Sequence, residues 1–284
     1  EIYINKGDFK FEKLPPSSGI NKNKVWSSGV CIVDINNDGF QDIYVSQQGP
    51  YKNPEERRNL FYINNGDLTF TESAAIMGLN DPNYSTQATF VDFDKDGDLD
   101  CYVLNESKYE GVILDAVYKD LEDPANMRAA SGSFFENKGN LQFEDITAKA
   151  GVMNYGYGLG VVISDFNEDN WPDIYVANDY AVPDFMYINQ KDGTFKESIN
   201  AYTRQISYFG MGCDVGDINN DGLVDIGVVD MAAEDHFRDK TLMAGMDSEG
   251  FKHYFYDLGY QYEYMFNSLQ LNNGNKTFSN IAAV

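Results

Sequence analysis

Residues 34–45 read DINNDGFQDIYV, in which Asp or Asn occupies every second position before a Gly at the sixth. An EF-hand loop begins in the same way, but it closes with a Glu at its twelfth position and lies between two helices. Here the twelfth residue is Val45, the last acidic residue is Asp42, and the β-favouring residues Ile-Tyr-Val follow it. The pattern therefore predicts a nine-residue cation loop that leads directly into a β-strand.

The same loop occurs four times along the chain, so the sequence is an internal repeat. The further copies are DFDKDGDLD from Asp92, DFNEDNWPD from Asp165 and DINNDGLVD from Asp217. In a second motif an Asn precedes a Phe by six positions, and this motif occurs five times, at Asn5/Phe11, Asn64/Phe70, Asn137/Phe143, Asn189/Phe195 and Asn272/Phe278. The copy at Asn64 begins Asn-Asn-Gly between two β-favouring runs, which is typical of a tight hairpin.

The spacing between the two motifs defines the repeating unit. Each hairpin Phe lies 22 or 23 residues before the first Asp of the next loop, whereas the ninth loop residue lies 16 to 47 residues before the next hairpin Asn. One connection is therefore nearly constant, and the other takes up all the insertions. Each unit contains four runs rich in Val, Ile, Tyr and Phe, and four-stranded sheets repeated radially form a β-propeller.

We therefore predict an all-β fold, a β-propeller of four-stranded antiparallel blades with cation-binding loops. Residues 1–284 form one propeller domain or segment, with a half blade at 1–20 and complete blades at 25–79, 84–152, 155–201 and 206–284. Because the half blade lacks a matching half at the other end of the chain, we expect the sequence to be a segment of a longer polypeptide.

Each loop offers the oxygen ligands that a hard cation prefers. Side chains at positions 1, 3, 5 and 9 supply carboxylate or amide oxygens, position 7 supplies a backbone carbonyl, and Gly at position 6 permits the sharp turn. Such a ligand set excludes Zn²⁺ and Cu²⁺ and favours Ca²⁺ over Mg²⁺. The sequence predicts four Ca²⁺ sites, with these ligands: Asp34, Asn36, Asp38, Phe40 and Asp42; Asp92, Asp94, Asp96, Asp98 and Asp100; Asp165, Asn167, Asp169, Trp171 and Asp173; Asp217, Asn219, Asp221, Leu223 and Asp225.

The third loop departs from the pattern, because Asn170 stands at the Gly position and Pro172 precedes the last ligand. Asn adopts left-handed backbone more readily than most residues do, so we still expect a site there. A bound cation would reduce the repulsion between the carboxylates of each loop. We therefore interpret all four loops as structural Ca²⁺ sites rather than as catalytic centres.

The composition excludes several classes of partner. The chain carries 21 Lys and Arg against 45 Asp and Glu, a net charge of −24, which argues against nucleic acid and against attachment to anionic lipid. No run of 18 apolar residues is present, so we expect no membrane insertion by this segment. Cys31, Cys101 and Cys213 are far apart and lack zinc-ligand spacing, so we interpret them as buried thiols.

At these motifs the chain resembles the FG-GAP/VCBS repeat family, the calcium-loop propellers that include the head of integrin α subunits. The stretches INNGDLTFTESA, VDINNDGFQDIYV and SDFNEDNWPDIYVANDY are similar to the ASPIC/UnbV-type VCBS repeat surface proteins of Bacteroidota, which are related to cartilage acidic protein. The resemblance implies a seven-bladed propeller and an extracellular or cell-surface location on the bacterial outer membrane. It also implies membership of an outer-membrane protein complex for adhesion or nutrient capture.

We expect function to lie on the long connections, because insertions carry function more often than the scaffold does. The longest connections lie at 46–58, 105–133 and 230–266. In an integrin-like arrangement they leave the blades on the face opposite the Ca²⁺ loops, together with the connections between blades. Residues 253–266, HYFYDLGYQYEYMF, are rich in aromatic side chains that either dock a partner or pack against the propeller.

The sequence thus predicts a non-catalytic, calcium-stabilised binding or adhesion propeller that presents this face to a protein or glycan partner. No nucleophile elbow, zinc-protease motif or phosphate loop is present, and no catalytic residue can be nominated. One alternative is a polysaccharide lyase, in which the Tyr-rich stretch 254–264 would line a cleft with His236, His253 and Arg238. A lectin is a further alternative, and it predicts the same pocket in several blades.

Overall fold

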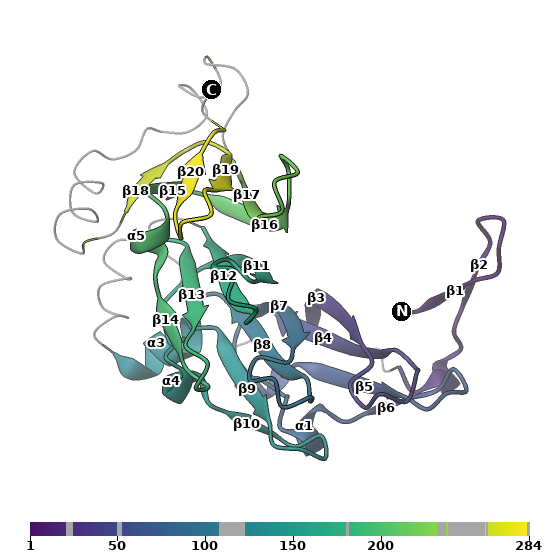
Figure 1. Cartoon of the computed structure of the whole chain (residues 1–284). Coiled ribbons are helices and arrows are strands. Elements are labelled where there is room, and N and C mark those ends of the chain that lie inside the picture. Colours follow the sequence, from purple (N-terminus) through teal and green to yellow (C-terminus); the bar gives the residue numbers. More distant parts are fainter. Residues whose placement is uncertain are drawn as a thin grey trace.

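The computed structural model describes residues 1–20, 25–49, 53–107, 123–179, 182–231, 237, 259 and 261–282. These residues form four antiparallel sheets of four strands each, preceded by a two-stranded hairpin (Figure 1). The predicted all-β fold is confirmed. The blade limits and the closure of the sheets into a ring stay predictions.

The strands have the following bounds. The first sheet contains β3 (Trp26–Val33), β4 (Asp42–Gln48), β5 (Leu60–Asn64) and β6 (Phe70–Glu72). The second contains β7 (Ser85–Val91), β8 (Asp100–Asn105), β9 (Ser133–Asn137) and β10 (Phe143–Asp145). The third contains β11 (Gly158–Ser164), β12 (Asp173–Asn178), β13 (Phe185–Asn189) and β14 (Phe195–Glu197). The fourth contains β16 (Gly210–Gly216), β17 (Asp225–Asp230), β19 (Ser268–Asn272) and β20 (Phe278–Asn280). The N-terminal hairpin contains β1 (Tyr3–Asn5) and β2 (Phe11–Lys13).

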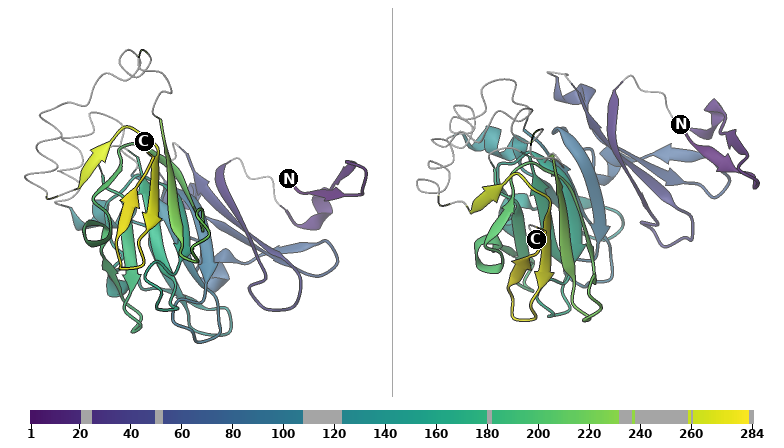
Figure 2. Two further views of the ribbon diagram at one scale, coloured as in Figure 1. Left: turned by 45° about the horizontal axis from the view of Figure 1, so that its top comes forward. Right: turned by 90° about the horizontal axis from the view of Figure 1, so that it is seen from above.

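Each acidic loop joins the first two strands of a sheet, and each Asn/Phe motif joins the last two. In the first sheet Val33 pairs with Asp42 and Asn64 pairs with Phe70, and the other three sheets repeat this register. The acidic loops and the hairpin turns therefore lie at the same end of every sheet. The sheets fan out with their faces toward one another, as the views in Figure 2 show.

Apolar side chains fill the space between neighbouring sheets. Tyr44 and Phe61 of the first sheet pack with Val103 and Phe135 of the second. The second and third sheets meet through aromatic rings in edge-to-face contact, including Phe93, Phe134 and Phe195. The third interface contains Tyr175, Met186, Ile226 and Phe278. These contacts explain why the strand runs are apolar on both faces, because each middle sheet is covered on two sides.

One-turn helices explain the nearly constant connection between sheets. The helices α1 (Ala74–Met77), α4 (Thr147–Ala150) and α5 (Ile199–Tyr202) each follow the last strand of a sheet. Gly78 ends α1 with a φ of +85°, and a Cβ atom there would lie 2.5 Å from the carbonyl oxygen of Phe143 in the next sheet. Gly151 makes the same approach to Phe195. The connection is therefore packed between two sheets, which leaves no room for insertions.

The N-terminal hairpin has the register of the last two strands of the other sheets, because Asn5 pairs with Phe11. Gly19 approaches the carbonyl of Phe70 as Gly78 approaches that of Phe143. A cavity of about 1230 Å³ separates the hairpin from the first sheet, whose facing surface is apolar. Val30 on that surface is 64% exposed, whereas Ala88, the equivalent residue of the second sheet, is 6% exposed.

A helix and a pair of parallel strands lie outside the four-strand units predicted from the sequence. The helix α3 (Pro124–Ala130) lies in the connection between β8 and β9. The strands β15 (Gln205–Ser207) and β18 (Tyr262–Tyr264) form a parallel pair beside the fourth sheet. None of the helices in the described part of the chain has the length and apolar character of a membrane span.

Candidate cation-binding loops

The first Asp of each loop holds the loop backbone through hydrogen bonds. Asp34 accepts the N–H of Asp38 at 3.1 Å and the N–H of Gly39 at 2.9 Å. The first Asp of the third and fourth loops likewise accepts the N–H groups of the fifth and sixth loop residues, and Asp92 accepts that of Gly97. The loops are thus folded around their acidic side chains by the protein itself.

The sixth position adopts left-handed backbone in all four loops. The φ angles are +86° at Gly39, +99° at Gly97 and +89° at Gly222. Asn170 replaces Gly in the third loop and has a φ of +66°. The Asn at this position is therefore compatible with the turn, as its tolerance of left-handed backbone suggests.

The ninth Asp of each loop is buried and ties the loop to the hairpin turn. Asp42 accepts the N–H of Ile35 through Oδ2 at 3.1 Å and the N–H of Asn64 through Oδ1 at 2.8 Å. Asp100, Asp173 and Asp225 make the same two bonds in their own sheets. This Asp therefore joins the acidic loop to the hairpin through its own hydrogen bonds.

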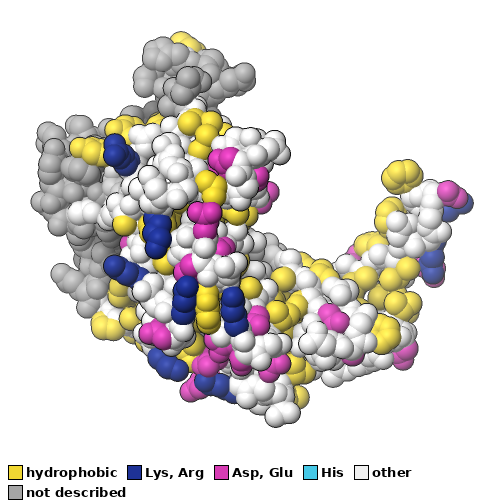
Figure 3. All heavy atoms as spheres, in the orientation of Figure 1, with side chains coloured by type: hydrophobic (Ala, Val, Ile, Leu, Met, Phe, Trp, Pro, Cys, Tyr) yellow, Lys and Arg dark blue, Asp and Glu magenta, His cyan; other side chains and the backbone are white. Residues whose placement is uncertain are grey.

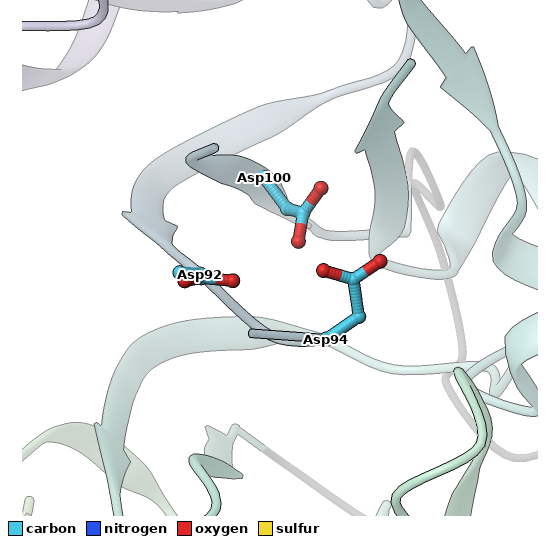
Figure 4. Close-up of side chains that lie close together, drawn as sticks. All are labelled: Asp92, Asp94 and Asp100. Carbon is cyan, nitrogen blue, oxygen red and sulfur yellow. The ribbon is translucent and has the colours of Figure 1, made fainter. Parts of the chain in front are cut away.

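The second loop brings three carboxylates to one point. Asp92, Asp94 and Asp100 offer oxygen atoms within 4.8 Å of one another, and no other such group of three occurs among the described residues. Figure 4 shows the three side chains directed toward a common space. The Oδ1 atom of Asp92 is buried and has no hydrogen-bond partner in the described part of the structure.

Burial also disfavours negative charge in the second loop. Desolvation raises the pKa of Asp100 to about 7 and raises the pKa of Asp94 above its ordinary value. Three converging carboxylates with an unpartnered oxygen fit a hard divalent cation, which prefers oxygen ligands and offsets their charge. The residues present in this loop therefore fit Ca²⁺.

The third loop also contains a buried oxygen atom without a described hydrogen-bond partner, although Asn167 stands where the second loop has Asp94. The buried Oδ1 of Asn167 has no hydrogen-bond partner among the residues described. Desolvation raises the pKa of Asp173 to about 7. Asp169 lies 3.2 Å from the Lys191 ammonium group, and Lys95 of the second loop lies over the Trp171 ring. The third loop therefore contacts the second loop directly.

The first and fourth loops are more exposed, and their polar side chains form hydrogen bonds within the loop. Asn36 donates to Asp38 at 2.8 Å, and Asn219 donates to Asp221 at 2.9 Å. These two loops therefore carry no unpartnered oxygen of the kind found at Asp92. Asp96 and Asp98 lie outside the cluster of the second loop. Figure 3 shows acidic side chains gathered over the lower ends of the second and third sheets, with Lys and Arg among them.

The hairpin Asn is a residue whose role the sequence did not reveal. At the level of sequence, a hairpin turn alone explains its recurrence. In the structure the Asn64 N–H binds Asp42, its Nδ2 donates to the Gln41 carbonyl, and its Oδ1 accepts the N–H of Gly66. The hydrogen bond between this Asn and the ninth Asp has nearly the same length in all four sheets. The number of residues between the two varies, so sequence spacing does not reveal the contact.

The opposite end of the sheets carries the long connections. His236, Arg238, His253 and Tyr254, which the lyase alternative requires, lie outside the described residues. Tyr262, Tyr264 and Phe266 form a row of rings with centroids 6.3 and 5.5 Å apart and nearly parallel planes. Tyr262 and Tyr264 are 40% and 37% exposed, so part of this row meets the solvent.

Two buried carboxyl groups lie near this aromatic row. Asp184 is fully buried and accepts hydrogen bonds from the Tyr175 hydroxyl and the Asn178 N–H. Glu263 on β18 is 2% exposed, and burial raises its pKa well above the ordinary value. Sequence analysis did not nominate either residue, because buried and exposed carboxylates look alike in an acidic chain.

Comparisons with known proteins agree with this architecture. The model of the FG-GAP-like repeat matches residues 53–103 and 165–228. The chain is 25% identical over 221 residues to cartilage acidic protein 1 of Homo sapiens, covering 76% of this chain and 32% of that protein. It is 22% identical over 174 residues to integrin alpha-3 of Cricetulus griseus, covering 61% of this chain and 16% of that protein.

A solved structure, that of the rhamnogalacturonan lyase YesW, is 13% identical with a TM-score of 0.38, covering 72% of this chain and 40% of that one. The chain spans about a third of the length of the cartilage acidic protein that it matches. The predicted resemblance is confirmed: the FG-GAP-like repeat matches two parts of the chain, and the chain is similar to cartilage acidic protein 1 and to an integrin α subunit.

Proposed function

We propose that this chain is a calcium-stabilised binding segment that works outside the cell and presents its long connections to a protein partner. The observation that carries the proposal is the second loop, where Asp92, Asp94 and Asp100 converge and one buried oxygen lacks a partner. The recurrence of this loop at one register of four sheets supports structural Ca²⁺ at all four positions.

An extracellular setting is consistent with this proposal, because free Ca²⁺ at about 1 mM would fill sites with a Kd as weak as about 10⁻⁴ M. The likeness to integrin alpha-3 and to cartilage acidic protein 1 supports the same setting. A place on the bacterial outer-membrane surface, within a complex for adhesion or nutrient capture, is the finer form of the proposal.

The aromatic row supports a protein partner. Tyr262, Tyr264 and Phe266 lie side by side with nearly parallel rings, and Tyr262 and Tyr264 are 40% and 37% exposed. Exposed Tyr side chains suit a protein surface, where Tyr combines apolar contact with hydrogen bonding. We therefore propose that this end of the sheets docks a protein.

Calorimetric titration of EDTA-treated protein with Ca²⁺, run beside thermal unfolding, tests the proposal. We expect several sites with Kd values of about 10⁻⁶ to 10⁻⁴ M and a rise in the melting temperature. The variant Asp92→Ala/Asp94→Ala is expected to lose one site and to retain the others. Absence of binding in the wild-type protein would overturn the proposal, whatever the variant does.

A further inference from the structure

The hairpin Asn of the third sheet connects two acidic loops that belong to different sheets. The Asn189 N–H donates to Asp173 of its own loop at 2.8 Å. Its Nδ2 group donates to the carbonyl of Phe93 in the second loop at 2.9 Å and to that of Pro172 at 3.2 Å. Its Oδ1 atom accepts the N–H of Lys191 at 2.8 Å. Every polar group of this buried side chain is therefore engaged.

The hairpin Asn of the fourth sheet repeats this arrangement one sheet further on. The Asn272 N–H donates to Asp225 at 2.9 Å, and its Nδ2 group donates to the Phe166 carbonyl of the third loop at 3.3 Å. Its Oδ1 atom accepts the N–H of Gly274 at 3.0 Å. The bond to Phe166 spans 106 residues of sequence.

The loop residue whose carbonyl accepts the hydrogen bond from the hairpin Asn also donates its own N–H to the ninth Asp of its loop. Phe93 donates its N–H to Asp100 at 3.1 Å, while its carbonyl accepts from Asn189. Phe166 likewise donates its N–H to Asp173 at 3.0 Å, while its carbonyl accepts from Asn272. The hydrogen bonds thus run without a break from Asp100 through Asp173 to Asp225.

The contacts of Asn64 and Asn137 differ from this pattern. Asn64 donates through Nδ2 to the Gln41 carbonyl, and Asn137 donates to the Leu99 carbonyl, both within their own sheets. Both residues hold their own ninth Asp as Asn189 does. They therefore provide matched controls. Each donates its N–H to the ninth Asp of its own sheet, but its recorded Nδ2 bond does not reach another sheet.

We propose that Asn189 and Asn272 couple cation binding at the second, third and fourth loops, so that an ion in one loop raises the affinity of the next. The proposal rests on the proposed function, because it presupposes that the loops bind Ca²⁺. An ion orders the loop that it occupies, and the ordered peptide then fixes the hairpin Asn of the next sheet. That Asn holds the ninth Asp of its own loop, so the next ion binds a site that is already arranged.

Trp171 provides a spectroscopic signal close to the third site. It is the seventh residue of the third loop, and Tb³⁺, an oxygen-seeking ion that emits when a nearby indole is excited, would report occupancy there. The other Trp of the chain, Trp26, begins β3 at the end remote from the first loop. The Trp171 ring also faces Lys95 of the second loop, so its emission reports the second and third sites in the wild-type protein, and the third site once Asp94→Ala has emptied the second.

A double-mutant cycle with this signal tests the coupling. In the wild-type background, Asp94→Ala empties the second site and is expected to weaken Tb³⁺ binding at the third site about fivefold, the effect of about one hydrogen bond. In the Asn189→Ala background the same substitution is expected to cause no such further loss. In the Asn64→Ala background the full loss is expected to remain.

The cycle also separates coupling from simpler effects. The lost charge of Asp94 acts through space, and the contact of Lys95 with Trp171 stays in place, so both effects would be the same in the two backgrounds. Equal losses in the wild-type and Asn189→Ala backgrounds would therefore overturn the proposal. Absence of Tb³⁺ emission together with absence of calorimetric Ca²⁺ binding would overturn the proposed function instead.

A second cycle keeps the inference testable if Asn189→Ala does not fold. Asn272→Ala, combined with Asp221→Ala in the fourth loop, examines the next link with the same Trp171 emission. Emptying the fourth site is expected to weaken the third about fivefold in the wild-type protein, but not in the Asn272→Ala background. An equal loss in both backgrounds contradicts the coupling at this link.

Discussion

The backbone N–H of Asn189 lies 2.8 Å from Oδ1 of Asp173, although 16 residues separate them in the sequence. The equivalent bond occurs in each of the four sheets, and in each the second carboxylate oxygen accepts another backbone N–H. The ninth Asp of the loop is therefore a structural residue as well as a predicted ligand. It differs from the ligands at positions 1, 3 and 5 in joining the loop to the hairpin, whereas their backbone hydrogen bonds stay within the loop, as those of Asp34, Asn36 and Asp38 do.

The first prediction concerns this difference. Asp42→Ala leaves the buried N–H groups of Ile35 and Asn64 without their partner, and is expected to cost about 2 to 4 kcal/mol of unfolding free energy in EDTA. Asp38→Ala, at an exposed position of the same loop, is expected to cost less than about 1 kcal/mol under those conditions. Urea unfolding of both variants measures the difference, and equal costs would contradict it.

The second prediction concerns removal of the cation. A site filled at about 100 times its Kd adds about 2.7 kcal/mol to folding, so EDTA is expected to lower the melting temperature markedly. Ca²⁺ is expected to restore it at lower concentrations than Mg²⁺, because Mg²⁺ demands near-octahedral geometry and releases its water reluctantly. Thermal unfolding in matched buffers measures this, and an unchanged melting temperature in EDTA would contradict it.

The third prediction concerns the packed connection between sheets. Gly78→Ala would place a methyl group 2.5 Å from the Phe143 carbonyl and would also require left-handed backbone at φ +85°. We expect the free energy of unfolding to fall by more than about 3 kcal/mol. Left-handed backbone alone would cost only roughly 1 to 2 kcal/mol. Gly139→Ala is the control, since its φ is +84° and nothing lies within 4 Å of the added atom. Similar losses for the two variants, measured by urea unfolding, would rule out the clash.

The fourth prediction concerns pH. Burial raises the pKa of Asp184 to about 7 from an ordinary value of 3.8, so the folded protein keeps this proton where the unfolded chain has released it. The stabilising contribution of the proton is complete below about pH 4 and is lost as the pH rises toward 7, by up to about 1.4 kcal/mol per pH unit. Asp184→Asn keeps an acceptor for Asn178 and is expected to lose this part of the pH dependence.

Urea unfolding at several pH values in saturating Ca²⁺ measures the effect, because bound cations suppress protonation of the loop carboxylates. The informative quantity is the difference in slope between the wild-type protein and Asp184→Asn. Parallel stability profiles for the two proteins would show that Asp184 releases its proton equally in the folded and unfolded states.

The repeated motifs made the sheets predictable, because their spacing reflects a constant packed connection. The connection itself was predictable only as a length, since the close approach of Gly78 to Phe143 depends on the neighbouring sheet. The loop residues were identified by type and register, but only the structure shows that three carboxylates converge in the second loop. The bond between Asn189 and Phe93 joins residues 96 positions apart, a distance at which a single sequence carries no local signal.

The direction of the links between sheets has a mechanical consequence. Each recorded link joins the hairpin of one sheet to the loop of the sheet before it, as Asn272 joins Phe166 and Asn189 joins Phe93. A tensile load applied at the C-terminal end therefore meets these links one after another rather than all at once. Peeling would proceed sheet by sheet, with one link lost at each step.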